Sequence, residues 1–315
     1  MTMIESVLAS PAANNLFFIV GPTASGKSEL AAEVSARCDA EIVGADAFQI
    51  YRGLPLLTAQ PNEETLRLAP HHLIGAVPLT EEMNAARFRV LALSKIEEIN
   101  RRGRLALVVG GSGLYLKALT HGLAPLPQVD SELRAELNAL SLEELNKRLL
   151  AVDPPGSQTI DRKNKRRLVR ALEISAQTKR PASELRSEWQ QSAPEVRGIC
   201  VFRERAELFS RIDRRVETMF REGVTDEIAR LTETGSTAAR TLGLDQIRLL
   251  LAEKISSDEC VAAIQQATRH YAKRQLTWFR RQTTFEPLNL SLLKDHTAAV
   301  DWILQKVALL RPLND

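Results

Sequence analysis

The chain has 315 residues, of which 44% are hydrophobic and 26% charged, and its formal net charge is +3. This length fits one large domain or two smaller ones, and no apolar run approaches the ~18 residues that a membrane-spanning helix needs. The three isolated cysteines predict free thiols in a reducing compartment and no zinc site. The first fifteen residues contain no basic side chain, so we expect no secretory signal and a cytoplasmic protein.

Predicted strands and helices alternate over the first 120 residues. An apolar run at 16–20 predicts a buried strand, and residues 28–37 predict a helix. A second strand is expected at 40–46, a helix at 85–101 and a third strand at 105–109. This alternation is typical of an α/β fold with a doubly wound parallel sheet.

The composition changes after residue 122. Residues 123–130 form a proline-marked linker, 131–188 have the spacing of helices, and 196–202 predict a strand that returns the chain to the sheet. We therefore predict three parts: an N-terminal tail at 1–15, a catalytic core at 16–121 and 196–315 with a helical C-terminal part, and a helical insertion domain at 122–195.

The segment "GPTASGKS" follows the first predicted strand directly. Gly21, Gly26, Lys27 and Ser28 fit the phosphate loop G-x-x-x-x-G-K-[ST]. In such a loop the backbone N–H groups surround phosphate oxygens, the lysine adds a positive charge, and the hydroxyl contacts a magnesium ion. A glycine-rich turn without a ligand is the alternative.

Asp46 follows the second predicted strand, at the sheet edge where ligands of parallel sheets bind. Its carboxylate could hold magnesium, orient a hydroxyl, accept a proton, or simply cap a turn. The third strand ends in "VVGGSG", without the aspartate that usually completes a site for splitting a nucleotide triphosphate. The sequence therefore favours phosphates that leave the substrate over phosphates that are hydrolysed as fuel.

Two basic clusters suggest a polyanionic partner. Residues 161–170 hold six basic side chains and one acid, and residues 269–281 hold five basic side chains and no acid. Such clusters can follow a nucleic-acid backbone, and the alternative for each is a solvated helix face.

Over about residues 16 to 285 the chain resembles the tRNA dimethylallyltransferases, also called tRNA isopentenyltransferases. The resemblance rests on "GPTASGKS", "GADAFQIYRG", "TAQP", "PHHLIG", "GGSGLYLKAL", "RRLVRALEI", "RIDRRVETM" and "YAKRQLTWFR". "GGSGLYLKAL" and "YAKRQLTWFR" are specific to the family, whereas many kinases and ATPases share the phosphate loop. The resemblance implies transfer of a dimethylallyl group from its diphosphate to the exocyclic amine of the adenosine immediately 3′ of the anticodon.

The resemblance also implies residue roles. Asp46 matches the general base, while Lys27 and Arg215 match catalytic cations on the leaving diphosphate, a role that Arg211 and Arg214 could share. The matching diphosphate-binding positions are Gly21, Pro22, Thr23, Ala24, Ser25, Gly26, Lys27 and Ser28, and Ser28 also matches a metal ligand. The matching tRNA-contact positions are Asp46, Ala47, Phe48, Gln49, Ser112, Arg134, Arg166, Arg167, Leu168, Val169, Arg170, Arg240, Thr241, Leu242, Gly243, Leu244 and Asp245.

The implied cofactor is Mg²⁺, and the implied partners are the anticodon stem-loop of tRNA and dimethylallyl diphosphate. We expect a monomer that does not bind a membrane. Ala47, Gln60 and Leu244 stand where the family commonly has serine, lysine and tyrosine. Three alternatives stay open: an enzyme that prenylates free adenine nucleotides, a nucleoside or shikimate-type kinase, and a diverged tRNA-binding protein without catalysis.

Overall fold

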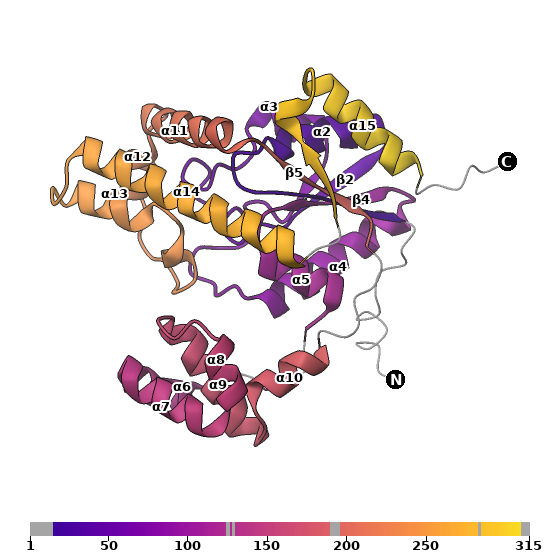
Figure 1. Ribbon diagram of the computed structural model, residues 1–315. Helices are drawn as coiled ribbons and strands as arrows, with labels where there is room; N and C mark the ends of the chain where they lie inside the picture. The colour runs from indigo at the N-terminus through magenta and orange to yellow at the C-terminus, as the bar shows by residue number, and fades with distance from the viewer. Residues whose placement is uncertain (1–14, 124–126, 128–129, 190–195, 283–284, 310–315) are drawn as a thin grey trace. The chain divides into compact units, whose positions relative to one another are not determined.

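The computed structural model describes residues 15–123, 127, 130–189, 196–282 and 285–309 (Figure 1). The predicted N-terminal tail therefore lies outside the described residues except for Asn15, as does most of the predicted linker at 123–130. The chain divides into two compact units, one of Met1–Thr120 with Glu195–Asp315 and one of His121–Pro194. Each unit has a hydrophobic core of its own.

A sheet of six parallel strands, in the order β3-β2-β4-β1-β5-β6, forms the centre of the first unit. Four strands coincide with the predicted ones: β1 (Leu16–Val20), β2 (Ala40–Gly44), β4 (Leu105–Gly110) and β5 (Gly198–Phe202). Every residue of β1, β2 and β4 is buried, because helices cover both faces of a parallel sheet. The prediction of an α/β fold with a parallel sheet is confirmed.

The sheet also contains two edge strands that the sequence did not indicate. β3 (His71–His72) has only two residues, which is too short for a hydrophobic pattern. β6 (Glu286–Asn289) contains Pro287, which lacks an N–H donor and is tolerated because this strand lies at the edge of the sheet.

Helices cover the sheet on both sides (Figure 1). On one side, α2 (Lys27–Arg37) and α15 (His296–Ala308) pack against Phe17 and Ile19 of β1 and Leu107 of β4. On the other side lie α4 (Ala85–Arg101) and α5 (Gly113–His121), joined by the stacked rings of Phe88 and Tyr115. The other α-helices among the described residues of this unit are α3 (Glu63–Leu68), α11 (Arg205–Arg221), α12 (Val224–Ala229), α13 (Leu244–Leu251) and α14 (Ser257–Gln282).

The second unit is entirely helical over its described residues. Its helices are α6 (Ser131–Ala139), α7 (Leu142–Val152), α8 (Pro154–Thr159), α9 (Lys165–Thr178) and α10 (Ala182–Trp189). Leu145, Leu149, Leu168 and Leu172 form the centre of its core. Buried Asp153 accepts hydrogen bonds from the backbone N–H groups of α8 and α10, which ties the two short helices together.

The parallel sheet determines where the chemistry lies, because the carboxyl ends of all its strands meet at one edge. The phosphate loop follows β1, Asp46 follows β2, Gly111 follows β4 and Arg203 follows β5. Among the described helices, none combines the length and the hydropathy that crossing a membrane requires.

Candidate active site

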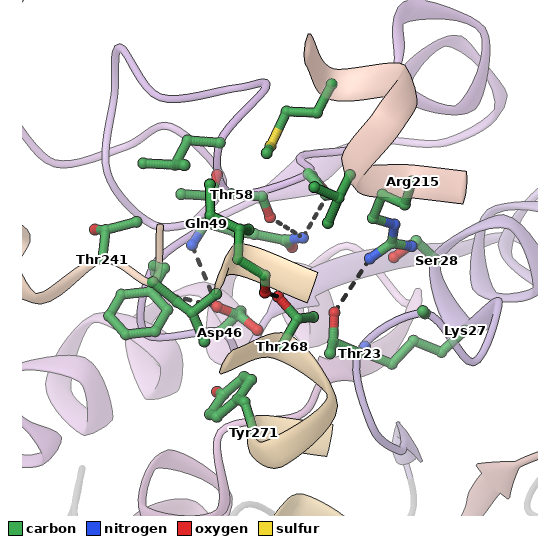
Figure 2. A pocket seen from close by; sticks show the side chains of 18 of the residues that line it. Thr23, Lys27, Ser28, Asp46, Gln49, Thr58, Arg215, Thr241, Thr268 and Tyr271 are labelled. Atoms are coloured by element: carbon green, nitrogen blue, oxygen red, sulfur yellow. Dashed lines mark hydrogen bonds between the residues drawn. The ribbon is translucent and has the colours of Figure 1, made fainter. Parts of the chain in front are cut away.

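A pocket at this edge of the sheet brings the predicted catalytic side chains together (Figure 2). Its polar end is formed by the phosphate loop and by Asp46 and Arg215. Another part of its wall is apolar and comes from the loop after Asp46, from α11, from the segment just before residue 244 and from α14: Leu57, Val216, Met219, Leu242 and Ile264. The pocket therefore combines a cationic, hydrogen-bonding end with a hydrophobic surface of a few side chains.

The phosphate loop adopts a conformation that only some residues tolerate. Gly26 has φ +96°, in the left-handed region that favours glycine, and Lys27 begins α2 directly after it. Three arginines donate hydrogen bonds to the loop: Arg203 Nε donates to the Ser25 carbonyl, Arg211 Nε donates to the Ala24 carbonyl, and Arg215 Nη1 donates to Thr23 Oγ1. The phosphate loop is therefore fixed by side chains that follow β5 or lie on α11, about 180 residues further along the sequence.

The structure separates the three arginines that the sequence could not rank. Arg215 lines the pocket and points to Thr23 (Figure 2). Arg211 braces the loop at Ala24 and is not among the residues that line the pocket, while Arg214 is exposed. Residues 211 and 215 lie four positions apart on one face of α11, and residue 214 points about 100° away from residue 215 around the helix axis.

Lys27 and Arg215 both line the pocket, where their charged groups are partly shielded from water. Burial lowers the pKa of Lys27 to about 8, with the charge of Asp46 acting against this shift and that of Arg215 adding to it. Burial also lowers the pKa of Arg215 from its usual value. Two neighbouring cations that lose solvent in this way are stabilised by a bound anion.

Asp46 uses one carboxylate oxygen to fix its own loop. Its Oδ1 accepts hydrogen bonds from the backbone N–H groups of Phe48 (2.9 Å) and Gln49 (3.3 Å). This oxygen therefore caps the turn, which is one of the roles that the sequence left open for Asp46. No hydrogen bond to Oδ2 is found among the described residues, and Asp46 lines the pocket. The side chain is therefore held in one orientation with an oxygen left to accept a proton.

The residues next to Asp46 divide into pocket wall and support. Phe48 and Gln49 line the pocket, and the Gln49 amide donates to the carbonyls of Thr58 and Ala59 across it. Ala47 donates its backbone N–H to the hydroxyl of buried Ser112, so this hydroxyl positions the loop that carries Asp46.

The segment from Arg240 to Asp245 also divides. Thr241 and Leu242 line the pocket, and the side chains of Arg240 and Asp245 are exposed. Leu244 is fully buried in the core between α11 and α14, and Gly243 precedes it as the N-cap of α13. A ligand in the pocket can therefore contact Thr241 and Leu242 but not the side chain of Leu244.

In the second unit, two of the side chains predicted to contact tRNA form ion pairs with a buried carboxylate. Glu173 has no exposed surface, and it accepts hydrogen bonds from the guanidinium groups of Arg134 and Arg170. A buried charge of this kind needs paired partners, so both arginines have a structural role. Leu168 and Val169 belong to the hydrophobic core, and their side chains are not accessible to a ligand.

Arg166 and Arg167 are the exposed members of this segment. They lie with Lys165 in the first turn of α9, where no acidic residue is present. Positive side chains at a helix N-terminus are unfavourable for the helix dipole, and together with the free N–H groups there they attract anions. Asn164 caps this end of α9 by accepting the Arg167 N–H, and the exposed positive side chains make the end a candidate surface for phosphates.

Sequence reasoning missed several residues of the pocket. Tyr271 and Thr268 of α14 line it, and the Tyr271 ring lies 6.3 Å from the ring of Phe48, centroid to centroid. Burial raises the pKa of the Tyr271 phenol, so it remains protonated at neutral pH. Tyr271 lies within the quoted motif "YAKRQLTWFR", but nothing in the pattern separates a pocket residue from a helix-core residue.

The oxygen atoms that line the pocket are suitable ligands for a divalent cation that binds together with phosphates. The described residues contain no group of three or more His, Cys, Asp or Glu side chains that could cage a metal. Mg²⁺ does not need such a cage, because it usually keeps several waters and binds one or two protein oxygens plus substrate phosphates. The Ser28 hydroxyl and the Asp46 carboxylate, both in the pocket, are donors of the required kind.

Fold and site together define an α/β protein with a phosphate-loop motif, a pocket lined by Lys27 and Arg215, and a separate helical unit. A model of the family described as "IPP transferase" matches residues 49–282. The tRNA dimethylallyltransferase of Akkermansia muciniphila is 40% identical over 290 residues, which cover 92% of this chain and 98% of that protein. This chain belongs to the tRNA dimethylallyltransferase family, and the resemblance found in the sequence is confirmed.

Solved structures share this fold. A tRNA isopentenylpyrophosphate transferase from Staphylococcus epidermidis superimposes with a TM-score of 0.68 at 29% identity, covering 93% of this chain and 98% of that one. A eukaryotic dimethylallyltransferase acting on tRNA has a TM-score of 0.80 at 24% identity, covers 95% of this chain and 81% of that one, and shares the fold.

The pKa of Lys27 predicts how anion binding depends on pH. The ammonium group is charged below about pH 8 and loses its charge above it. The affinity for inorganic diphosphate should therefore exceed that of a Lys27→Met variant by about tenfold or more at pH 7, and the ratio should fall toward one by about pH 9.5. Titration calorimetry of both proteins at each pH removes the contribution of the ligand's own ionisation. A ratio that stays constant from pH 7 to 9.5 would contradict this placement of Lys27.

Proposed function

We propose that this chain transfers a dimethylallyl group from dimethylallyl diphosphate to the exocyclic amine of the adenosine immediately 3′ of the anticodon in tRNA. The observation that carries the proposal is the composition of the pocket. A cationic phosphate loop, an apolar wall and an oriented carboxylate lie around one cavity. These are the features that a diphosphate, a five-carbon chain and an amine proton require.

The diphosphate end of the donor belongs at the phosphate loop. When the bond between the allylic carbon and the diphosphate oxygen breaks, negative charge develops on the leaving group. Lys27, Arg215 and the loop N–H groups are positioned to neutralise it. The Ser28 hydroxyl would help to hold Mg²⁺, and the ion would supply further positive charge against the leaving group.

The apolar part of the pocket belongs to the dimethylallyl group. Val216 and Met219 of α11 lie one turn or less beyond Arg215, so the hydrophobic wall begins next to the cationic end. Leu57 and Ile264 extend this wall. An isoprenoid carbocation formed here is shielded from water, which would otherwise capture it.

Asp46 acts as the general base. The exocyclic amine of adenine is a weak nucleophile, and it must lose a proton as the nitrogen–carbon bond forms. The free Oδ2 of Asp46 accepts that proton, while Oδ1 remains bonded to the turn. Atoms balance with one diphosphate released for each adenosine alkylated.

The acceptor is tRNA, as in the relatives named above. Its target base has to leave the stack of the anticodon loop, at a cost of about a few kcal/mol, and enter the pocket. Phe48 and Tyr271 offer aromatic surface there. The first turn of α9, with Arg166 and Arg167, supplies a phosphate-binding surface on the second unit.

The same proposal covers the second unit and the location of the protein. We assign tRNA binding to the second unit, and we expect the protein to act in the cytoplasm. An enzyme for free adenine nucleotides would have no use for the basic turn of α9, and family membership does not favour it.

Replacement of Asp46 tests the proposed chemistry. Asp46→Asn should lower the single-turnover transfer rate by about 10²–10⁴-fold, because the amide cannot accept the proton. Diphosphate should bind no more weakly, since a negative charge has been removed. The product is measured by mass spectrometry of nucleosides from digested tRNA.

Asp258→Asn, at an exposed acid in the first turn of α14, is the matched control and should transfer at the wild-type rate. A near wild-type rate for Asp46→Asn would exclude Asp46 as the base.

A salt titration tests the proposed RNA surface on α9. Changing Arg166 and Arg167 together to Gln should weaken tRNA binding and reduce the slope of log affinity against log salt by about 1.4–1.8, if each side chain meets one phosphate. The dimethylallyl donor should bind as before. Filter binding between about 50 and 200 mM salt gives the slope.

The control variant changes Lys147 and Arg148, two exposed basic residues of α7 in the same unit. Their replacement should leave the slope closer to wild type. Equal losses in both variants would show that general positive charge, and not the α9 terminus, binds the RNA.

A further inference from the structure

Gln275 of α14 connects two loops of the site without lining the pocket. Its Oε1 accepts a hydrogen bond from the Thr23 backbone N–H of the phosphate loop, at 2.9 Å. Its Nε2 donates to the carbonyl of Gly111 in the loop after β4, also at 2.9 Å. The side chain is only 5% exposed, so both bonds are made away from bulk water.

The two contacts require a glutamine amide. A backbone N–H can only donate and a backbone carbonyl can only accept, so the bridging group must accept at one end and donate at the other. The space is also closely fitted, because a Cβ added to Gly111 would lie 2.4 Å from Gln275 Nε2. Glycine at position 111 therefore leaves room for this amide.

The bridge continues from Gly111 toward Asp46. Ser112, the next residue, donates its backbone N–H to the carbonyl of Ala45 at 3.3 Å and accepts the backbone N–H of Ala47 on its hydroxyl at 2.8 Å. These two contacts fix both neighbours of Asp46. Position 111 is thus the link between Gln275 and the loop that carries the carboxylate.

The Oε1 end of the Gln275 side chain is connected, through Thr23, to the cation Arg215. Thr23 gives its backbone N–H to Gln275, and its hydroxyl oxygen accepts from Arg215 Nη1 at 3.1 Å. The Thr23 N–H is thereby unavailable to a phosphate, so only the hydroxyl hydrogen of this residue is left for the ligand. Gln275 therefore hydrogen-bonds both to Thr23, which contacts Arg215, and to the loop after β4, which supports Asp46.

We propose that Gln275 is a positioning residue that sets the separation between the diphosphate-binding loop and the general base. This inference rests on the proposed function, in which the allylic carbon has to lie between the leaving oxygen and the amine whose proton goes to Asp46. Rates of such reactions are sensitive to displacement, and a shift of about 1 Å costs on the order of 10²-fold. No contact between Gln275 and a substrate is required.

Methionine at this position tests the bridge, because it has a similar length and neither donates nor accepts strongly. With saturating donor and tRNA, Gln275→Met should lower the single-turnover rate by about 10–100-fold. Affinity for tRNA should stay within about twofold of wild type. Gln266→Met, at an exposed glutamine of the same helix, is the matched control and should retain the wild-type rate.

Glutamate provides a readout that a loss of packing would not produce. A protonated carboxyl group can accept from the Thr23 N–H and donate to the Gly111 carbonyl, as the amide does, whereas an ionised carboxylate only accepts. Burial at this position raises the pKa of the introduced carboxyl group. The rate of Gln275→Glu relative to wild type should therefore rise by about tenfold or more as the pH falls from about 8 to 5.5.

Taking the ratio at each pH cancels the titration of Lys27, which both proteins share. Tyr271, which bonds to Gln275 within α14, has a raised pKa and does not titrate in this range. The proposal is overturned if the relative rate of Gln275→Glu does not change with pH, or if Gln275→Met transfers within about twofold of wild type. Failure of the proposed function itself is distinct, since the wild-type protein would then form no prenylated adenosine.

Discussion

The site depends on the crowding of positive charge around one loop. Lys27 and Arg215 converge on the phosphate loop, and burial lowers the pKa of both groups. Three arginines already use donors to hold the loop in shape, with Arg203 at Ser25, Arg211 at Ala24 and Arg215 at Thr23. A multivalent anion relieves the mutual repulsion of these groups, and diphosphate has the charge and the size for this role.

The parallel sheet makes this arrangement possible. Because the strands end at one edge, the phosphate loop after β1 and Asp46 after β2 face the same pocket, although β4 lies between the two strands. The loop after β4 carries no acid, and its Gly111 and Ser112 instead receive Gln275 and support the Asp46 loop. A position that binds metal in many nucleotide-hydrolysing proteins is here occupied by a hydrogen-bonded brace.

Local sequence patterns predicted much of the fold. β1, β4 and β5 are apolar over five or six residues, β2 is apolar apart from Glu41, and α4 has a clear helical period, so each was found within about two residues. β3 and β6 were missed, because one is too short for a pattern and the other contains a proline. Such edge strands are defined by their neighbours and not by their own sequence.

The sequence motifs predicted that Lys27 and Asp46 lie together, and both line the pocket. The site was not predictable where packing decides. Arg211, Arg214 and Arg215 differ only in their direction on α11, and Gln275 meets Thr23 across 252 residues of sequence. Leu244, which replaces a common tyrosine, is fully buried, and Gln60 in place of a lysine bonds to the carbonyls of Gln49 and Tyr51.

The central claim is that the phosphate loop binds a leaving group and not a fuel. It is tested most directly by measuring diphosphate release and adenosine prenylation together, in a reaction that contains dimethylallyl diphosphate, tRNA and Mg²⁺ but no nucleotide triphosphate. The account predicts one diphosphate for each prenylated adenosine and no release when tRNA is omitted. A requirement for ATP or GTP, or steady hydrolysis of either without modification of tRNA, would contradict it.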